Sequence, residues 1–106
     1  MELSEQEFRV KADDALEDAR RALLPLADSA DFEVELQNGV LQILFEEPTE
    51  AKFVVSPNAP VRQIWVSALS RSFKLPWSAE LSRFALDGEP LPNLLTRLVN
   101  EQLGQG

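Results

Sequence analysis

The apolar residues of this chain follow a helical spacing near its two ends and a strand spacing between them. Close to the N-terminus they recur every three or four positions, as on one face of an amphipathic helix: Phe8, Ala12, Ala15, Ala19, Leu23 and Leu26. The same period returns near the C-terminus, at Leu91, Leu94, Leu95, Leu98, Val99 and Leu103. Between them, residues 31–36 alternate strictly between charged and apolar, which is typical of a strand with one buried face. The order is therefore helix, strands, helix.

Local signals predict both ends of the first helix. Ser4 and Glu7 have the spacing of a capping box, so the helix should begin at about Glu5. Proline disfavours the helical conformation in the residue before it. Pro25 should therefore end the helix near Leu24.

Turn residues divide the middle of the chain into strands. Asn38-Gly39 accepts the two positive φ angles of a type I′ hairpin turn. We expect strands at residues 31–36, 40–45, 51–56, 61–68, 72–75 and 83–86, and turns at 46–50, 57–60 and 87–90. Short turns produce an antiparallel sheet, and two amphipathic helices need one of its faces to bury their apolar sides. We therefore predict one α+β domain over residues 1–106, a two-layer sandwich with both helices on one face of about five to six strands.

The charge of the chain limits the partners it can bind. Its 106 residues include 18 acidic and 10 basic side chains, and the net charge is −8. Nucleic acids and anionic membranes need positive charge, so we expect neither as a partner. A cation or a basic protein surface is favoured instead. Residues 1–5 lack the basic start of a signal peptide, and no stretch of about 18 apolar residues occurs, so we expect a cytoplasmic protein.

The chain contains neither cysteine nor histidine. This excludes disulfides and thiolate sites, and it removes the commonest general base. We see no carboxylate pair or serine–lysine arrangement that would replace them, so we do not expect an enzyme. Any bound metal must be held by oxygen ligands, which suit hard cations.

Acidic residues gather on the first helix and on the strand that follows it. By spacing, up to eight carboxylates form one acidic surface: Asp13, Asp14, Glu17, Asp18, Asp28, Asp31, Glu33 and Glu35. We call six of them the acidic ridge: Asp13, Asp14, Glu17, Asp18, Asp31 and Glu33. One interpretation is a docking surface for a basic partner, or a cation site whose affinity is modest because no turn wraps around an ion. The other is a solvated helix face beside an edge strand that charge protects from aggregation.

Trp65 lies on the polar side of its predicted strand. Period-two alternation places Ile64 and Val66 on one face, and Gln63, Trp65 and Ser67 on the other. A tryptophan on a solvated sheet face either packs under neighbours such as Arg62 or Lys74, or serves as the anchor of a protein interface.

Three segments together resemble the frataxin family. They are residues 35–43 around the first hairpin, residues 60–65 with the pattern Pro-x-x-Gln-Ile-Trp, and residues 88–95 at the start of the last helix. The resemblance implies the frataxin fold, which agrees with the predicted sandwich. It also implies an iron-binding regulator or iron donor of iron–sulfur cluster assembly.

The resemblance carries site residues with it. It implies that the acidic ridge binds Fe²⁺ or Fe³⁺ weakly through carboxylates. It also implies that Gln63 and Trp65 contact a cysteine desulfurase and an iron–sulfur scaffold protein, and we assign Asn38 and Ser67 to the same partner-binding set. We expect a monomer, with iron-dependent oligomerisation as the alternative.

The chain departs from the family pattern at positions that fall on the sheet surface: Ser56, Pro57, Arg71, Ser72, Phe73 and Lys74. These departures concern the partner contacts more than the fold. The alternative function is therefore an acidic interaction module without a metal, which binds a basic partner through the same sheet face.

Overall fold

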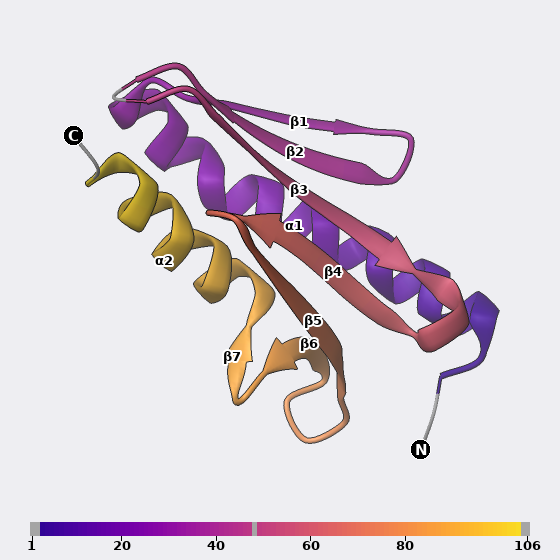
Figure 1. Ribbon diagram of the computed structural model, residues 1–106. Coiled ribbons are helices and arrows are strands. Elements are labelled where there is room, and N and C mark those ends of the chain that lie inside the picture. Colours follow the sequence, from indigo (N-terminus) through magenta and orange to yellow (C-terminus); the bar gives the residue numbers. More distant parts are fainter. Residues whose placement is uncertain (1–2, 48, 105–106) are drawn as a thin grey trace.

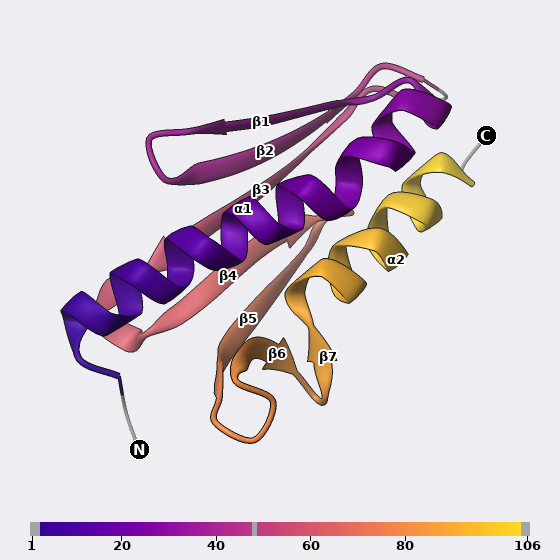
Figure 2. The same cartoon turned by 180° about the vertical axis from the view of Figure 1, so that it is seen from behind.

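The computed structural model describes residues 3–47 and 49–104, which form two layers (Figure 1). Met1 and Glu2 at the start of the chain, and Pro48 in the predicted turn at 46–50, lie outside the described residues. One layer is an antiparallel sheet and the other consists of two helices. Seen from behind, both helices cover the same face of the sheet (Figure 2). The predicted two-layer sandwich is confirmed.

The sheet is a simple meander in which each strand pairs with the next along the chain. Its seven strands are β1 (Glu33–Gln37), β2 (Val40–Phe45), β3 (Ala51–Asn58), β4 (Gln63–Ala68), β5 (Arg71–Ser78), β6 (Arg83–Leu86) and β7 (Glu89–Pro90). A short 3₁₀ helix, η1 (Ala59–Val61), joins β3 to β4. Asn38 and Gly39 have φ angles of 53° and 75°, so the predicted hairpin turn between β1 and β2 is confirmed.

The prediction of five to six strands was slightly too low. β7 was missed because its two residues, Glu89 and Pro90, were assigned to a turn. β3 was predicted to end at Ser56 but continues to Asn58, and β5 continues through Pro76. Cross-strand pairing extends these strands beyond their local apolar pattern, since Asn58 pairs with Gln63 and Gln63 with Pro76.

The first helix, α1 (Glu5–Ala30), begins as predicted. The Glu7 amide donates to the Ser4 hydroxyl over 3.1 Å, and the Ser4 amide donates to the Glu7 carboxylate over 3.0 Å, which completes the capping box.

The predicted end of α1 near Leu24 was wrong, because the helix continues through Pro25 to Ala30. An interior proline removes one helical hydrogen bond and is unfavourable. The residues beyond it, Leu26, Ala27 and Ala30, pack against the core, and this burial offsets the loss. Asp31 caps the helix in the left-handed conformation (φ 62°), so β1 starts two residues later than predicted.

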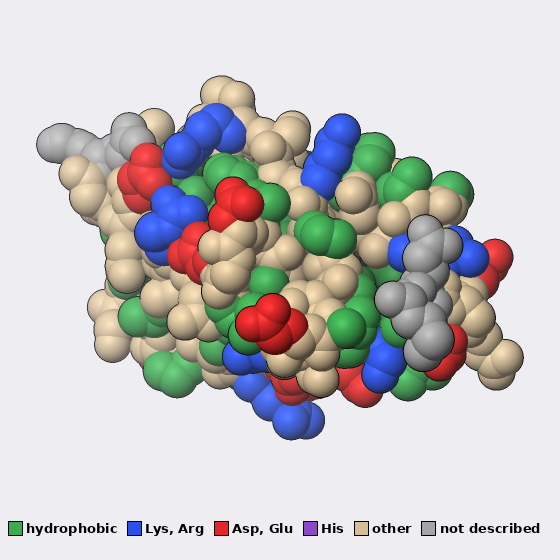
Figure 3. Space-filling model, turned by 90° about the horizontal axis from the view of Figure 1, so that it is seen from below, with side chains coloured by type: hydrophobic (Ala, Val, Ile, Leu, Met, Phe, Trp, Pro, Cys, Tyr) green, Lys and Arg blue, Asp and Glu red, His purple; other side chains and the backbone are tan. Residues whose placement is uncertain are grey.

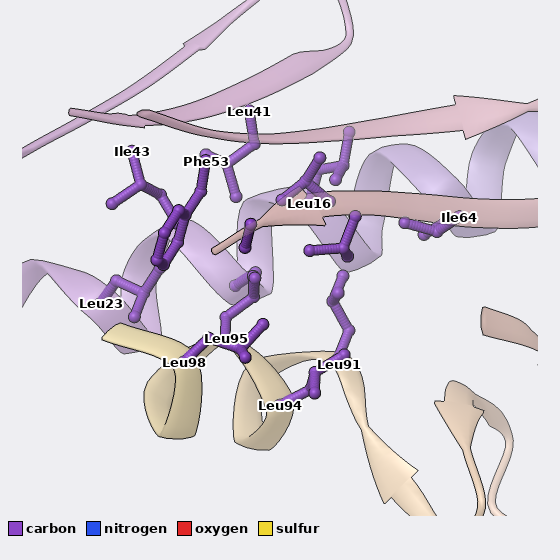
Figure 4. Packing of buried hydrophobic residues seen from close by; sticks show 14 of the residues in the cluster. Leu16, Leu23, Leu41, Ile43, Phe53, Ile64, Leu91, Leu94, Leu95 and Leu98 are labelled. Carbon is purple, nitrogen blue, oxygen red and sulfur yellow. The ribbon is translucent and has the colours of Figure 1, made fainter. Parts of the chain in front are cut away.

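The second helix, α2 (Leu91–Leu103), lies beside α1 over the sheet. Its apolar residues meet those of α1 and of the inner sheet face in one core (Figure 4). The fully buried residues include Leu16, Leu23, Leu41, Ile43, Phe53, Ile64, Leu91, Leu94, Leu95 and Leu98. Because the helices cover only this face, the opposite face of the sheet stays open to solvent. No helix in the described part of the chain is long and apolar enough to cross a membrane.

Candidate functional site

Trp65 lies on the open face of the sheet, as its position in the alternating pattern predicts. Its neighbours Ile64 and Val66 are buried against the helices, whereas 37% of Trp65 remains exposed. It is one of the few large apolar side chains in the described residues that are exposed to this degree. An exposed tryptophan on a rigid strand can anchor a protein interface, because a large side chain is buried there at little entropic cost.

Two side chains fix the position of the indole. The Trp65 Nε1–H donates to Oε1 of Gln63 over 2.9 Å, and the Lys74 ammonium lies over the ring at 4.9 Å from its centroid. Trp65 pairs directly with Lys74 on β5 and with Ser56 on β3. Arg62, the other side chain considered as a cover, donates instead to the carbonyl oxygens of Leu3 and Ala59.

The remaining predicted partner-binding residues lie in two places. Ser67 is exposed two positions after Trp65, so it shares the open face of β4. Asn38 lies in the turn between β1 and β2, where it borders a hollow together with Asp13 and Ser56. Gln63, Trp65 and Ser67 thus lie on β4, and Asn38 lies in the turn between β1 and β2. Ser56 and Lys74 are the cross-strand neighbours of Trp65.

One carboxylate of the acidic ridge is held in ion pairs. The Arg20 guanidinium donates to Glu17 at 2.6 and 3.0 Å, and Arg21 donates to it at 3.2 Å. The hydrogen bonds from Arg20 are the main reason why the pKa of Glu17 lies below the ordinary glutamate value. Glu17 is therefore ionised but already neutralised by its own helix.

The other ridge residues are divided among three hollows. Asp14 and Asp18 border one hollow with Lys11, Trp77 and Arg83. Asp31 and Glu33 border a second, which also includes the following side chains from beyond the predicted ridge: Glu46, Glu50 and Lys52. Asp13 borders a third hollow, beside Asn38.

The separation of these carboxylates determines how the acidic ridge could bind a metal ion. Among residues 3–47 and 49–104, no three carboxylates converge closely enough to hold one ion. On the side seen in Figure 3, acidic and basic side chains are interspersed among apolar ones. The oxygen donors have the chemistry that hard cations prefer, but within the described residues the structure offers no preformed chelate of three carboxylates.

Sequence reasoning missed two features of these surfaces. Glu46 and Glu50 approach the start of β1 only because β2 and β3 are paired beside it. Lys74 was considered as a cover for the ring, but its position directly opposite Trp65 depends on the register of β4 and β5. Period-two alternation places Lys74 on the open face but does not determine its partner.

Comparisons with known proteins give a consistent result. A family model described as a frataxin-like domain matches residues 1–105. The iron–sulfur cluster assembly protein CyaY of Pseudomonas fluorescens Pf0-1 is 32% identical over 108 residues, which cover 98% of this chain and 93% of that protein. CyaY of Pseudomonas aeruginosa is 37% identical over 82 residues, which cover 74% of this chain and 74% of that protein. The solved structure of a frataxin from Psychromonas ingrahamii superposes on this chain with a TM-score of 0.77. The match covers 94% of this chain and 91% of that frataxin. Because the two sequences are only 17% identical, this similarity supports the fold alone.

Proposed function

Because this chain belongs to the frataxin family, we propose that it acts in iron–sulfur cluster assembly by binding partner proteins rather than by catalysis. Its relatives that match over nearly their whole length are named for that process. The sequence lacks the thiol nucleophile of cysteine and the commonest general base, histidine, which favours binding over catalysis.

The observation that carries the proposal is the exposed Trp65 on the open sheet face. Gln63 and Lys74 hold the ring in place before any partner arrives, so little conformational freedom is lost on binding. We propose that this face binds the cysteine desulfurase and the scaffold protein of cluster assembly, with Trp65 as the central contact and Gln63, Ser67 and Asn38 around it.

Binding of the purified desulfurase–scaffold complex to Trp65→Ala tests this proposal. Removing a central aromatic anchor should weaken binding by roughly thirtyfold or more, while the circular dichroism spectrum stays that of the folded protein. Leu81→Ala is a matched control, because Leu81 is similarly exposed (41%) but lies in the turn between β5 and β6. Equal binding by the wild-type chain and Trp65→Ala would remove Trp65 from the interface.

We further propose that iron associates weakly with the acidic ridge as cargo. The exposed carboxylates supply suitable oxygens, and their separation into several contacts favours weak rather than tight binding. An anaerobic NMR titration with Fe²⁺ should broaden the amide signals of residues 13–18 and 31–33 and leave those around Trp65 unchanged. Asp14→Asn combined with Asp18→Asn should reduce the broadening at residues 14–18 and leave that at residues 31–33 unchanged.

We propose that the folded protein is a monomer. Light scattering after size-exclusion chromatography should give one mass near 11.9 kDa without iron. The same measurement with added iron decides between a monomer and iron-dependent association. A larger mass that appears only with iron would favour association.

A further inference from the structure

Acidic residues are absent from one long segment of this acidic protein. Residues 51–79 contain no aspartate or glutamate, although the chain has 18 of them. The segment holds four of the ten basic residues, Lys52, Arg62, Arg71 and Lys74. It spans β3, β4 and β5, which form the part of the open sheet that surrounds Trp65. The segment that carries Trp65 therefore has a net positive charge, opposite in sign to the charge of the molecule as a whole.

Two of these four cations are occupied within the fold. Arg62 donates to backbone carbonyl oxygens, and Arg71 forms an ion pair of 3.0 Å with Glu101 of α2. Lys74 is exposed and makes no ion pair with any of the described residues. Its nearest neighbours across the strands are Trp65 and, beyond it, Ser56, which carry no charge. Lys52, the fourth, borders the hollow that Asp31 and Glu33 also border. Lys74 is thus the cation that the region around the indole presents to solvent.

The carboxylates of β1 lie too far away to neutralise Lys74 across the sheet. The carboxylates on the open face of β1, Glu33 and Glu35, lie four strand spacings from β5, the strand that carries Lys74. At about 4.8 Å per spacing, this separation is about 19 Å. The Debye length at physiological salt is about 8 Å, so the field of these carboxylates is largely screened at Lys74.

We propose that the face around Trp65 recognises a partner segment that carries a carboxylate beside an apolar side chain. The carboxylate pairs with the Lys74 ammonium, and the apolar side chain packs on the indole that the same ammonium covers in part. This inference rests on the proposed docking role of Trp65 and adds the charge of the partner. The net charge of −8 predicts a basic partner for this sheet face, whereas this inference predicts a partner segment with a negative charge.

The test compares four variants in binding to the purified desulfurase–scaffold complex, by calorimetry at low and physiological salt. Lys74→Glu places a negative charge against the proposed carboxylate and should weaken binding at least about tenfold, whereas Lys74→Gln should weaken it less. Lys74→Arg should retain most of the affinity. Lys11→Glu is the matched control: Lys11 also lies over a tryptophan, 4.8 Å from the ring of Trp77, but outside the open face. Lys11→Glu changes the net charge by the same amount as Lys74→Glu, and it should alter the binding affinity less than about twofold.

Each outcome separates this inference from the docking proposal. If Trp65→Ala loses binding while Lys74→Glu binds as the wild type does, the partner surface is neutral, and the inference fails although docking stands. If Lys74→Glu binds more tightly, the partner is basic and the inference is overturned. If Lys11→Glu weakens binding as much as Lys74→Glu does, the effect follows net charge rather than the Trp65 face, and the inference is again overturned. If Trp65→Ala binds as the wild type does, the docking role of Trp65 fails. The inference then fails with it, because it rests on that role.

Discussion

Lys74 and Trp65 occupy directly opposite positions on β5 and β4, and the lysine ammonium lies 4.9 Å from the centroid of the indole ring. An ammonium above an indole is attracted by the negative face of the ring while its charge remains available to solvent. Because Gln63 accepts a hydrogen bond from the same indole, the largest exposed aromatic group of the sheet is fixed in orientation. The pair therefore combines an apolar anchor with a positive charge.

Removing Lys74 should expose the Trp65 ring. In a Trp77→Phe background, where Trp65 is the remaining tryptophan, Lys74→Ala should increase acrylamide quenching and shift the emission to longer wavelength. Lys52→Ala removes an equal charge from β3 and should leave the emission unchanged, because Lys52 pairs with Leu44 and not with the indole. Unchanged quenching in Lys74→Ala would mean that the ammonium does not cover the ring in solution.

Replacing Pro25 should stabilise the protein. Proline in a helix interior is about 3 kcal/mol less favourable than alanine, although the stiffer unfolded chain returns part of this. Pro25→Ala should therefore raise the free energy of unfolding by about 1–3 kcal/mol, measured by urea denaturation. Pro92→Ala is the matched control, since Pro92 lies in the favoured first turn of α2 and its replacement should give no gain. A loss of stability in Pro25→Ala would show that the ring itself contributes packing.

Truncation at the helix–sheet boundary should be costly. Leu95 is completely buried between α2 and the sheet, so Leu95→Ala loses transfer free energy and leaves a cavity, at a cost of about 2–5 kcal/mol. Val10 is 58% exposed on α1, and Val10→Ala should change stability by less than about 0.5 kcal/mol. Equilibrium unfolding in urea measures both, and similar values for the two variants would contradict the assigned core.

The pair between Glu89 and Arg97 should make stability depend on pH. The Arg97 guanidinium donates to Glu89 at 2.9 and 3.0 Å, and these hydrogen bonds hold the pKa of Glu89 below its ordinary value. The folded state thus binds this proton less readily than the unfolded state, so the contribution is complete above the unfolded pKa of about 4.3. It disappears as the pH falls through the lower folded pKa.

Glu89→Gln tests this dependence through its melting temperature. The variant should melt below the wild type at pH 7, and the difference should vanish at the acidic end of the titration. Glu80→Gln serves as a control, because Glu80 makes no ion pair within the described part of the chain. A difference that grows on acidification would contradict the lowered pKa.

Features that depend on a few neighbouring residues follow directly from the sequence. The capping box at Ser4 and the hairpin turn at Asn38-Gly39 form as predicted, because each is set by side chains and φ angles within four positions. The exposure of Trp65 also follows locally, since successive strand residues point to opposite faces. The two-layer arrangement follows from the apolar periods, which leave the helices one surface on which to be buried.

Other features depend on contacts between residues far apart in the chain. Burial of Leu26, Ala27 and Ala30 carries α1 past Pro25, against the local preference of proline. The fold also divides the acidic ridge among separate hollows, because a helix and a strand present their carboxylates in different directions. Likewise, the register of β4 and β5 places Lys74 on Trp65.

The amino-acid sequence by itself thus determined the order of elements, the buried faces and the exposed tryptophan, because backbone geometry repeats every two or 3.6 residues. Tertiary structure alone decided where α1 ends, which carboxylates lie together and which cation covers the indole. These three features depend on the balance between burial and local strain and on the pairing between strands. No short stretch of sequence determines either of them.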